Sequence, residues 1–146
     1  MPGDASRNDP FFAFRFEISL AGLPAGGFSD CSGLGAETEI QDYPEGGRND
    51  TVHKLIGRSK QVNLVLKRGI VDRRLWDWYF DLTQGQIVTR HGTVTIRSPD
   101  GRSPVAEWEF NDAFPVKWTG PELNASQSAV AVETLELAHG GLRRRT

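Results

Sequence analysis

The stretch FAFRFEISL, residues 12–20, alternates between apolar and mostly polar side chains without interruption. Successive side chains of a β-strand point to opposite faces, so a period of two indicates a strand with one buried face. The apolar positions on this face are Phe12, Phe14, Phe16, Ile18 and Leu20. This stretch predicts a strand over residues 12–20 and makes a mainly β fold the first expectation for the chain.

Glycine and proline divide the residues that follow. The sequence GLPAGG at 22–27 predicts a turn, because glycine adopts positive φ and proline fixes the bend. A second strand region runs from about residue 28 to residue 40 and is interrupted near Gly33 and Gly35. Glycine inside a strand often accompanies a bulge or a sharp bend, so we expect the strand to bend there.

Residues 42–59 form a long polar stretch with several glycines, both signs of charge and no strong period. A loop of this length inside a compact domain is uncommon and is usually functional or disordered. The sequence therefore predicts a long functional loop between the second strand region and the next strand.

The middle of the chain contains one strand pattern and one helix pattern. Val62, Leu64 and Leu66 alternate with polar residues and predict a strand with these three on its buried face. Asp72 is a favourable N-cap residue, and Gly85 readily takes the left-handed conformation that ends a helix. The apolar residues between them follow the spacing of one helical face. They are Leu75, Trp78, Tyr79 and Leu82.

We expect these four helical residues to pack against the β structure, over the end of the sheet. Trp76 and Phe80 lie one step off this stripe, so one of them is expected to face a neighbouring subunit if the protein assembles.

The C-terminal part contains further extended segments. They are residues 86–97, 104–111, 114–118 and 129–138, with a loop over 119–128. The dipeptide Asp100-Gly101 is a hairpin signal. In the last strand the apolar parity changes between Val132 and Leu135, which requires either a bulge near residues 133–134 or a strand covered on both faces.

The composition of the chain excludes several classes of function. The 146 residues suit one domain, and a net charge of −2 argues against a dedicated nucleic-acid binder, which usually carries a basic excess. The single cysteine, Cys31, excludes an internal disulfide framework and a cysteine-rich zinc site. No apolar run approaches the length of a membrane span, and the first residues lack a secretory-signal pattern. We therefore expect synthesis in a reducing cytoplasm.

We expect three parts along the chain. Residues 1–10 are small and polar and predict a flexible tail. Residues 11–142 form the domain, and residues 143–146, with three consecutive arginines, form a solvated basic tail.

The search for catalytic chemistry is mostly negative. His53, His91 and His139 lie far apart in sequence and match no metal-ligand pattern. Cys31 would need a nearby histidine to act as a nucleophile, and packing is the favoured interpretation. The stretch at 32–37 contains a G-x-G but lacks the third glycine and the following helix of a phosphate site.

Charged clusters also favour a structural interpretation. Paired carboxylates can perform acid–base chemistry, but a solvated strand face is the favoured interpretation for both acidic pairs. These pairs are Glu37 with Glu39 and Glu107 with Glu109. The basic residues at 67–68 and 73–74 are interpreted as a surface salt-bridge region rather than a nucleic-acid site.

Four segments together resemble one known family. They are GGFSDCSGLGAETEIQDYPEGG (26–47), VNLVLKRGIVDRRLWDWY (62–79), WEFNDAFPVKWTGPELNA (108–125) and VAVETLELAHGGL (130–142). In this order and spacing they resemble the contractile-tail inner-tube family, the tail tube proteins similar to that of phage T4. Its members occur in phage tails and in extracellular contractile injection systems. The resemblance covers about residues 11–142, and Gly140 stands where an acidic residue is common in the family.

The resemblance implies a fold and an assembly. The implied fold is mainly β (β+α), a small antiparallel β-barrel or sandwich with one flanking α-helix, whose copies form hexameric rings. The implied function is a structural subunit of the hollow inner tube of a contractile injection machine, a conduit for cargo or DNA inside a contractile sheath. The subunit would be made in the cytoplasm and assembled into a phage tail or a phage-tail-like particle.

The resemblance also implies partners. They are further copies of the chain, a sheath protein, baseplate and tube-initiator proteins, and a tape-measure protein or cargo in the lumen. We expect no enzymatic activity, cofactor, metal, specific nucleic-acid site or membrane insertion by the monomer. A tube-initiator or adaptor ring of the same machine is one alternative. A small β-barrel ligand-binding module or enzyme is the alternative from a different class.

Assembly points to two sets of surface residues. The long loop is expected to contact neighbouring subunits, as in related tubes. Its expected contact residues are Tyr43, Glu45, Arg48, Asp50 and Lys54. The bore needs a wettable wall, which strand alternation places opposite the core stripe. The expected lumen-facing residues are Glu37, Glu39, Gln61 and Asn63. If carboxylates line the bore, six copies per ring make it negative and repel a polyanion.

Overall fold

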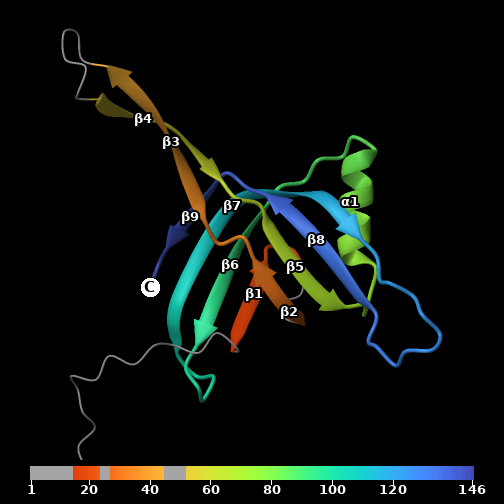
Figure 1. Ribbon diagram of the computed structural model, residues 1–146. Coiled ribbons are helices and arrows are strands. Elements are labelled where there is room, and N and C mark those ends of the chain that lie inside the picture. The colour runs from red at the N-terminus through yellow and green to blue at the C-terminus, as the bar shows by residue number, and fades with distance from the viewer. Residues whose placement is uncertain (1–14, 24–26, 45–51) are drawn as a thin grey trace, which may run out of the picture.

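The computed structural model describes residues 15–23, 27–44 and 52–146 of the protein. The tail expected over residues 1–10 lies outside these ranges, as do Phe12 and Phe14. The elements in chain order are β1 (Phe16–Leu20), β2 (Phe28–Ser32), β3 (Ala36–Pro44), β4 (Val52–Gln61), β5 (Leu64–Gly69), α1 (Arg74–Thr83), β6 (Arg90–Arg97), β7 (Pro104–Thr119), β8 (Val132–Ala138) and β9 (Gly141–Arg144) (Figure 1).

The strands form one large antiparallel sheet and one separate hairpin. Seven strands follow the order β1-β6-β7-β8-β5-β2, with β9 also paired to β7, whereas β3 and β4 pair only with each other. The first half of β7 pairs with β6 and β9, and its second half pairs with β8. Between the halves, Asp112 has a φ of 52°, a conformation that few residues other than glycine adopt.

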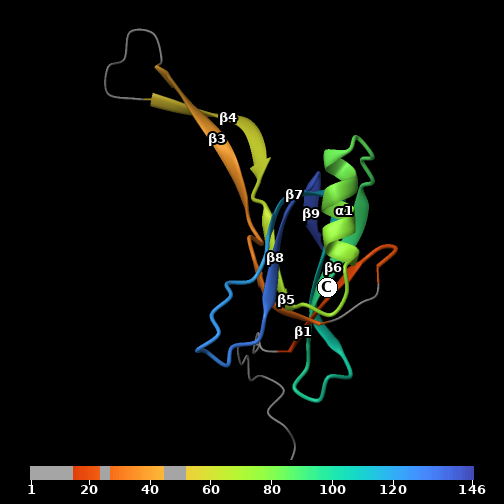
Figure 2. The ribbon, with the colours of Figure 1, turned by 90° about the vertical axis from the view of Figure 1, so that its right-hand side faces the viewer.

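This long strand therefore divides the sheet into two layers. We call β1, β6, the first half of β7 and β9 sheet A, and the second half of β7, β8, β5 and β2 sheet B. The inner faces of the two layers enclose one apolar core with α1 beside it (Figures 1 and 2). The expected mainly β, sandwich-like fold with a single flanking helix is confirmed for the part of the chain that the structure describes.

The core follows the predicted alternation in most strands. Ile18 and Leu20 of β1 are buried, and Ile18 lies opposite Val94 of β6. In sheet B, Leu64 and Leu66 of β5 lie opposite Leu137 and Leu135 of β8, and all four are fully buried.

The helix start predicted from the sequence lies within two residues of the observed start. Helix α1 begins at Arg74, and the cap position is Arg73 rather than Asp72. Asp72 still contributes, because its Oδ1 accepts a hydrogen bond of 2.9 Å from the backbone N–H of Arg74. Gly85 follows the helix with a φ of 87°, as expected of a residue that ends a helix.

The prediction of a long loop over residues 42–59 is wrong. Strand β3 continues to Pro44 and β4 begins at Val52, so most of this stretch is a β-hairpin. The sequence shows no strong period there because neither face of the hairpin is buried within the described part of the chain. Alternation is visible only where one face enters a core.

Other boundaries in the C-terminal half also differ. Strand β6 begins at Arg90 rather than residue 86, and residues 104–119 form one continuous strand instead of two pieces. Strand β9 was not expected, and it brings Arg143 and Arg144 into the sheet beside Glu109 and Trp108.

The apolar residues of the last strand change parity because one position on its buried face is a glutamate. Strand β8 pairs with β5 in a continuous register without a bulge. The residues on its buried face are Glu133, Leu135 and Leu137, whereas Val130 lies before the strand and is exposed. Neither a bulge in β8 nor a strand buried on both faces is present.

Candidate functional site

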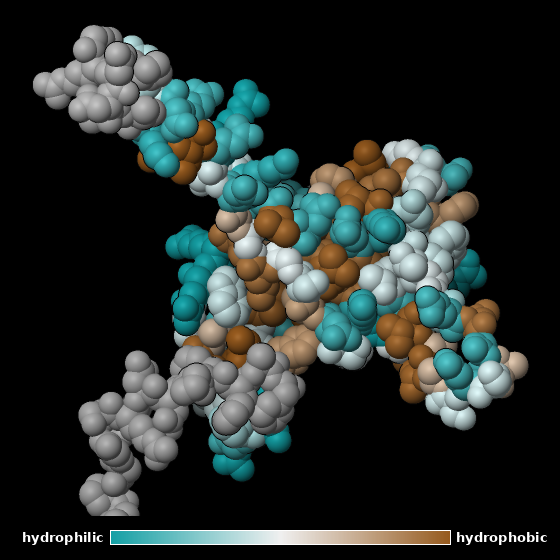
Figure 3. Space-filling model, viewed as in Figure 1, coloured by the Kyte–Doolittle hydropathy of each residue, from teal (hydrophilic) through white to brown (hydrophobic). Residues whose placement is uncertain are grey.

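The β3–β4 hairpin projects from the sandwich as a separate two-stranded sheet (Figures 1 and 2). Its apolar side chains are exposed: Ile40 60%, Tyr43 57%, Leu55 48% and Ile56 86%. Ile40 and Ile56 face each other across the strands and share one face, whereas Leu55 and Tyr43 lie on the other. Figure 3 shows this apolar surface as a brown patch in an otherwise hydrophilic arm. A lone two-stranded hairpin is marginally stable in water, and these four side chains have little cover among the described residues.

The root of the hairpin is a tight crossing of two backbones. Gly33, between β2 and β3, has a φ of 91°, and a β-carbon there would overlap the backbone oxygen of Asn63. The backbone N–H of Val62 donates to the carbonyl oxygen of Gly35 at 3.2 Å. The bend expected near Gly33 and Gly35 is confirmed, and it directs the arm away from sheet B.

Charge is divided between the two strands of the hairpin. The acidic residues lie on β3 and the basic residues on β4. They are Glu37, Glu39 and Asp42 on β3, and Lys54, Arg58 and Lys60 on β4. Glu37 lies opposite Lys60, and Asp42 lies opposite Lys54. One edge of the arm is therefore acidic and the other basic.

The residues singled out for assembly are distributed between the hairpin and its root. Tyr43 and Lys54, expected contact residues, are exposed on β3 and β4, as are Glu37 and Glu39, expected at the lumen. Glu45, Arg48 and Asp50 lie outside the described residues. Sequence reasoning assigned these residues to two surfaces, but those described here belong to one element.

The other two expected lumen residues lie where the hairpin meets sheet B. Gln61 ends β4 and is half-buried. The Nδ2 of Asn63 donates a hydrogen bond of 3.2 Å to Oε2 of Glu136 on β8. Val62 is exposed, so the prediction that it shares the buried face of Leu64 and Leu66 is wrong. The chain bends between β4 and β5, and the alternation starts anew at Leu64.

The outward face of sheet B is polar and balanced in charge. Asp30 of β2 lies opposite Lys67 of β5, and Glu136 of β8 lies opposite Lys117 of β7. Ser32, Thr119 and Thr134 share the remaining face with Val65, Val132 and Ala138. The outer strands of this sheet, β2 and the second half of β7, each have one edge without a strand partner among the described residues.

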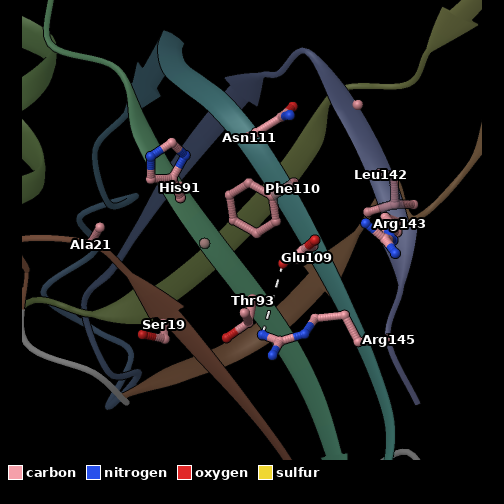
Figure 4. Close-up of a pocket in the computed structure, with 12 residues that line it drawn as sticks. Ser19, Ala21, His91, Thr93, Glu109, Phe110, Asn111, Leu142, Arg143 and Arg145 are labelled. Carbon is pink, nitrogen blue, oxygen red and sulfur yellow. Dashed lines mark ion pairs between the residues drawn. The ribbon is translucent and has the colours of Figure 1, made fainter.

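The outward face of sheet A contains a groove of about 660 Å³ (Figure 4). Its lining comes from β1, β6, β7 and the C-terminal residues, with Phe110 at its floor. Arg145 Nη1 lies 3.8 Å from a carboxylate oxygen of Glu107 and 3.8 Å from one of Glu109. Both residues of the acidic pair Glu107 and Glu109 therefore lie near the positive charge of Arg145.

The groups considered for catalysis do not form a reactive centre. His53 lies on β4, His91 on β6 and His139 after β8, where its Nε2 lies 3.1 Å from the carbonyl oxygen of Val62. Cys31 packs against the core, and burial raises its pKa to about 11, which keeps the thiol protonated at neutral pH. Within the described ranges, no group of three or more His, Cys, Asp or Glu residues is placed to hold a metal ion. No described helix is long and apolar enough to cross a membrane.

A buried ion pair connects sheet B to the helix. Arg68 Nε donates to Glu133 Oε1 at 3.0 Å, and both side chains are almost fully buried. Trp118 Nε1 donates to the other oxygen of Glu133 at 3.0 Å. Arg68 Nη2 also donates to Asp72 Oδ1 at 2.9 Å, directly before α1. The basic residues around 67–74 thus include one core residue, which sequence reasoning had treated as surface.

The helix packs by one face and exposes the other. Leu75 and Trp78 are buried, and Tyr79 and Leu82 are half-buried. The indole N–H of Trp78 donates to the carbonyl oxygen of Val88 at 2.8 Å. Trp76 and Phe80 are both exposed on the outer surface.

The family model of the T4-like virus tail tube protein gp19 matches residues 12–143. The chain belongs to this family. Its structural role as a tube protein follows from that membership and agrees with sheet edges that have no strand partner among the described residues. No curated protein matches the chain.

Solved structures share the fold of this tail tube family member. A chain of the extracellular contractile injection system PVC, solved as a sheath–tube complex in the extended state, is 24% identical with a TM-score of 0.85 over 93% of this chain and 91% of that one. A chain of the 6-fold symmetrised baseplate of the anti-feeding prophage AFP is 24% identical, with a TM-score of 0.83 over 95% and 97%. A chain of the AFP tube-terminating cap is 21% identical, with a TM-score of 0.88 over 98% and 95%.

Proposed function

We propose that the chain is the main inner-tube subunit of a contractile injection machine, in a phage tail or a phage-tail-like particle. Copies form hexameric rings that stack into a hollow conduit inside a contractile sheath. The family match over residues 12–143 carries this proposal. The similar AFP baseplate chain, solved with 6-fold symmetry, supports six copies per ring.

The sheet edges and the arm supply surfaces for this assembly. The free edges of β2 and of the second half of β7 lie at opposite ends of sheet B. A contact between two different edges is heterologous, and a rotation that closes turns such contacts into a ring. Ring closure removes edges that would otherwise recruit other strands. The hairpin, with exposed apolar residues on both faces, reaches neighbouring subunits.

We propose that the outward face of sheet B lines the bore. It is mainly polar, which suits a wetted wall, and it lies between the two free edges that ring closure would join. Asp30 and Glu136 balance Lys67 and Lys117 there, so the bore is close to neutral at this level. Glu37 and Glu39 lie on the hairpin, so a strongly negative bore does not follow from them.

The proposed partners are a sheath protein, baseplate and tube-initiator proteins, and a tape-measure protein or cargo in the lumen. The similar PVC chain comes from a sheath–tube complex, which supports a sheath partner. We propose no catalytic role. The subunit is made in the cytoplasm and acts in the assembled particle.

A single-ring component of the same machine is the second candidate. A chain in the structure of the AFP tube-terminating cap has a TM-score of 0.88 with this protein, which supports this candidate. Electron microscopy of the purified protein separates the two roles. Extended tubes support the main-tube subunit, and single rings that never elongate support an end component. A monodisperse monomer under all assembly conditions overturns both and favours a β-barrel binding module.

The role of the hairpin is tested by shortening it. Deletion of residues 46–52 removes most of the chain between β3 and β4 and leaves the sandwich core in place. We expect a protomer that unfolds as cooperatively as the parent but forms no tubes. Tubes of normal length from the deletion variant would contradict the role of the hairpin in assembly.

The bore assignment is tested by thiol labelling of intact tubes. Asn63→Cys and Lys117→Cys place thiols on or beside the outward face of sheet B, and Glu109→Cys is the matched control on the outward face of sheet A. We expect the first two thiols to react with small reagents and resist bulky ones, and the control to react with both. Equal labelling of all three by both reagents would place sheet B outside the bore.

A further inference from the structure

Strand β9 closes one edge of sheet A by following β7 around its bend. The second half of β7 pairs with β8 and the first half with β9, where Asn111 lies opposite Gly141. The backbone N–H of Gly140 donates to the carbonyl oxygen of Asn111 at 2.8 Å, so the chain stays beside β7 between these two strands. Strand β9 is the outermost strand on this side of sheet A (Figure 1). Without it, the edge of β7 at residues 107–111 would have no strand partner among the described residues.

The side chains of β9 match those of the edge that it covers. Leu142 lies opposite Phe110, a residue of the core, and packs against that core. The guanidinium carbon of Arg144 lies over the ring of Trp108, 5.5 Å from the ring centre, which is a cation–π contact. An apolar group and a cation of β9 thus each meet a side chain of suitable chemistry on β7.

Arg145 extends this match beyond the last residue of β9. Its backbone N–H donates to the carbonyl oxygen of Glu107 at 2.8 Å. Its Nη1 lies 3.8 Å from a carboxylate oxygen of Glu107 and from one of Glu109 (Figure 4). Where an extended segment adds to a sheet, backbone hydrogen bonds supply affinity and side-chain contacts supply specificity. The β7 edge at residues 107–111 has both kinds of contact for a short basic segment that contains a leucine.

Strand β9 is held less firmly than the inner strands. It has four residues, and its arginines are exposed. Ion pairs between exposed groups contribute little to stability. A strand that is paired on one side has fewer contacts to lose than a strand paired on both sides. Strand β9 can therefore open locally while β6 and β7 remain paired.

The outer edge of β9 is unsuited to further pairing. Proteins protect exposed sheet edges with very short strands and with charged side chains. Strand β9 has both features, because it is four residues long and is followed by a third arginine at 145. The edge beneath it is different, since it belongs to a strand of 16 residues and carries Trp108 and Phe110. A long apolar edge of that kind pairs readily with other chains.

We propose that β9 is a protective edge strand. The edge of β7 at residues 107–111 is a strand-binding site for a short segment with a leucine and arginines, and β9 of the same chain occupies it. Strands of other chains are thereby kept from pairing at this edge. The role concerns the protomer and does not depend on the proposed tube assembly.

A peptide tests the strand-binding site. The full-length chain with Leu142→Gln and Arg145→Pro, which we call the open variant, loses the apolar contact and the N–H that bonds to Glu107. The probe is a fluorescent peptide, GGLRRRT, with the sequence of residues 140–146. Anisotropy should show that micromolar peptide binds the open variant but not the parent, because tethered β9 acts at an effective concentration of about millimolar. Arg143→Gln, the matched control in the same strand, should behave like the parent.

The same variant shows whether β9 protects the edge. We expect the open variant to unfold as cooperatively as the parent and to form irregular aggregates, seen by electron microscopy, that excess peptide prevents. Absence of aggregates overturns the protective role. Absence of peptide binding, or equal binding of a peptide with Leu142→Gln, overturns the strand-binding site. Loss of cooperative unfolding overturns both, because β9 would then belong to the folding unit.

Disulfide trapping identifies the chain that supplies β9. Glu109 and Arg143 lie opposite each other, so Glu109→Cys combined with Arg143→Cys places two thiols within bonding reach. After oxidation we expect a monomer on a denaturing gel without reductant, and the parent chain controls for Cys31. Dimers or longer ladders would show that β9 pairs with another copy and would overturn the proposal. Each of these results leaves the proposed function intact.

Discussion

The sandwich and the hairpin are built from the same kind of strand but differ in what covers them. In the sandwich, the leucines of β5 and β8 face the opposite layer and are fully buried. In the hairpin, Ile40 and Ile56 form an equally regular cross-strand pair that remains exposed. The apolar side chains of the sandwich are buried within the chain, whereas those of the hairpin remain exposed. One β protein thus contains strands whose apolar residues build its own core and strands whose apolar residues do not.

The largest effect should come from removing a core side chain. Trp78 is 4% exposed and its N–H is bonded to the Val88 carbonyl. Trp78→Ala should lower the free energy of unfolding by about 3–5 kcal/mol, because it leaves a cavity and an unpaired carbonyl group. Denaturant titration of the isolated protomer measures this loss. A variant as stable as the parent would show that α1 is not part of the core. The contrast between the buried sandwich and the exposed hairpin would then not hold for the helix.

The buried ion pair should be the next most sensitive feature. Glu133→Gln removes the buried one of the two carboxylates that pair with Arg68 and leaves only the half-exposed Asp72. A hydrogen bond to a charged group contributes about 1.5–3 kcal/mol. The matched control is Asp77→Asn, which breaks the exposed pair with Arg73 and should cost about 0.2–1 kcal/mol. Equal losses in the two variants, measured by denaturant titration, would mean that burial does not distinguish the two pairs.

A smaller effect should depend on pH. The backbone N–H of Arg74, and then the charge of Arg68, lower the pKa of Asp72 below its ordinary value of 3.8. Ionised Asp72 therefore stabilises the fold fully above that value, and the contribution is lost as the pH falls through the folded-state pKa. Asp72→Asn should reduce stability by about 0.3–1 kcal/mol at neutral pH. The gap between parent and variant should narrow below pH 3.8; a constant gap would contradict this role.

The smallest effect on the protomer should come from the hairpin. Ile56→Ser should change the free energy of unfolding by no more than about 0.5 kcal/mol, as is usual for an exposed position. The same substitution should abolish tube growth seen by electron microscopy, because it makes the exposed pair polar. Loss of protomer stability comparable to that of Trp78→Ala would show that the hairpin belongs to the folding unit.

Sequence reasoning succeeded where a pattern had one buried face. The alternation that ends at Ile18 and Leu20, the leucines of β5, and the helix before Gly85 are all confirmed. The family and its mainly β fold were also recognised from four segments, and the family match extends over the same region. In these places local pattern and tertiary burial agree, which makes single-sequence inference effective.

It failed where burial depends on distant partners or is absent. The hairpin has no buried face, so its strands looked like a loop. Glu133 breaks the apolar pattern of β8, and only Arg68, far away in the sequence, explains a carboxylate in the core. For the candidate site, alternation identified Asn63 beside the polar face of sheet B, but it could not foresee the bend that exposes Val62 or the pairing of Asp30 with Lys67.

The strand order has a consequence for biosynthesis. Strand β8, which lies between β5 and β7 at the centre of sheet B, is one of the last elements to be synthesised. Strand β1 likewise gains its partner only after β6 has been synthesised, because Phe16 pairs with Ile96. A chain released before residue 132 lacks the strand that joins the two sides of sheet B, and pairings this distant in sequence form slowly. Incomplete translation products therefore lack the strand pairings that complete sheet B, so the sandwich forms only after nearly the whole chain has been synthesised.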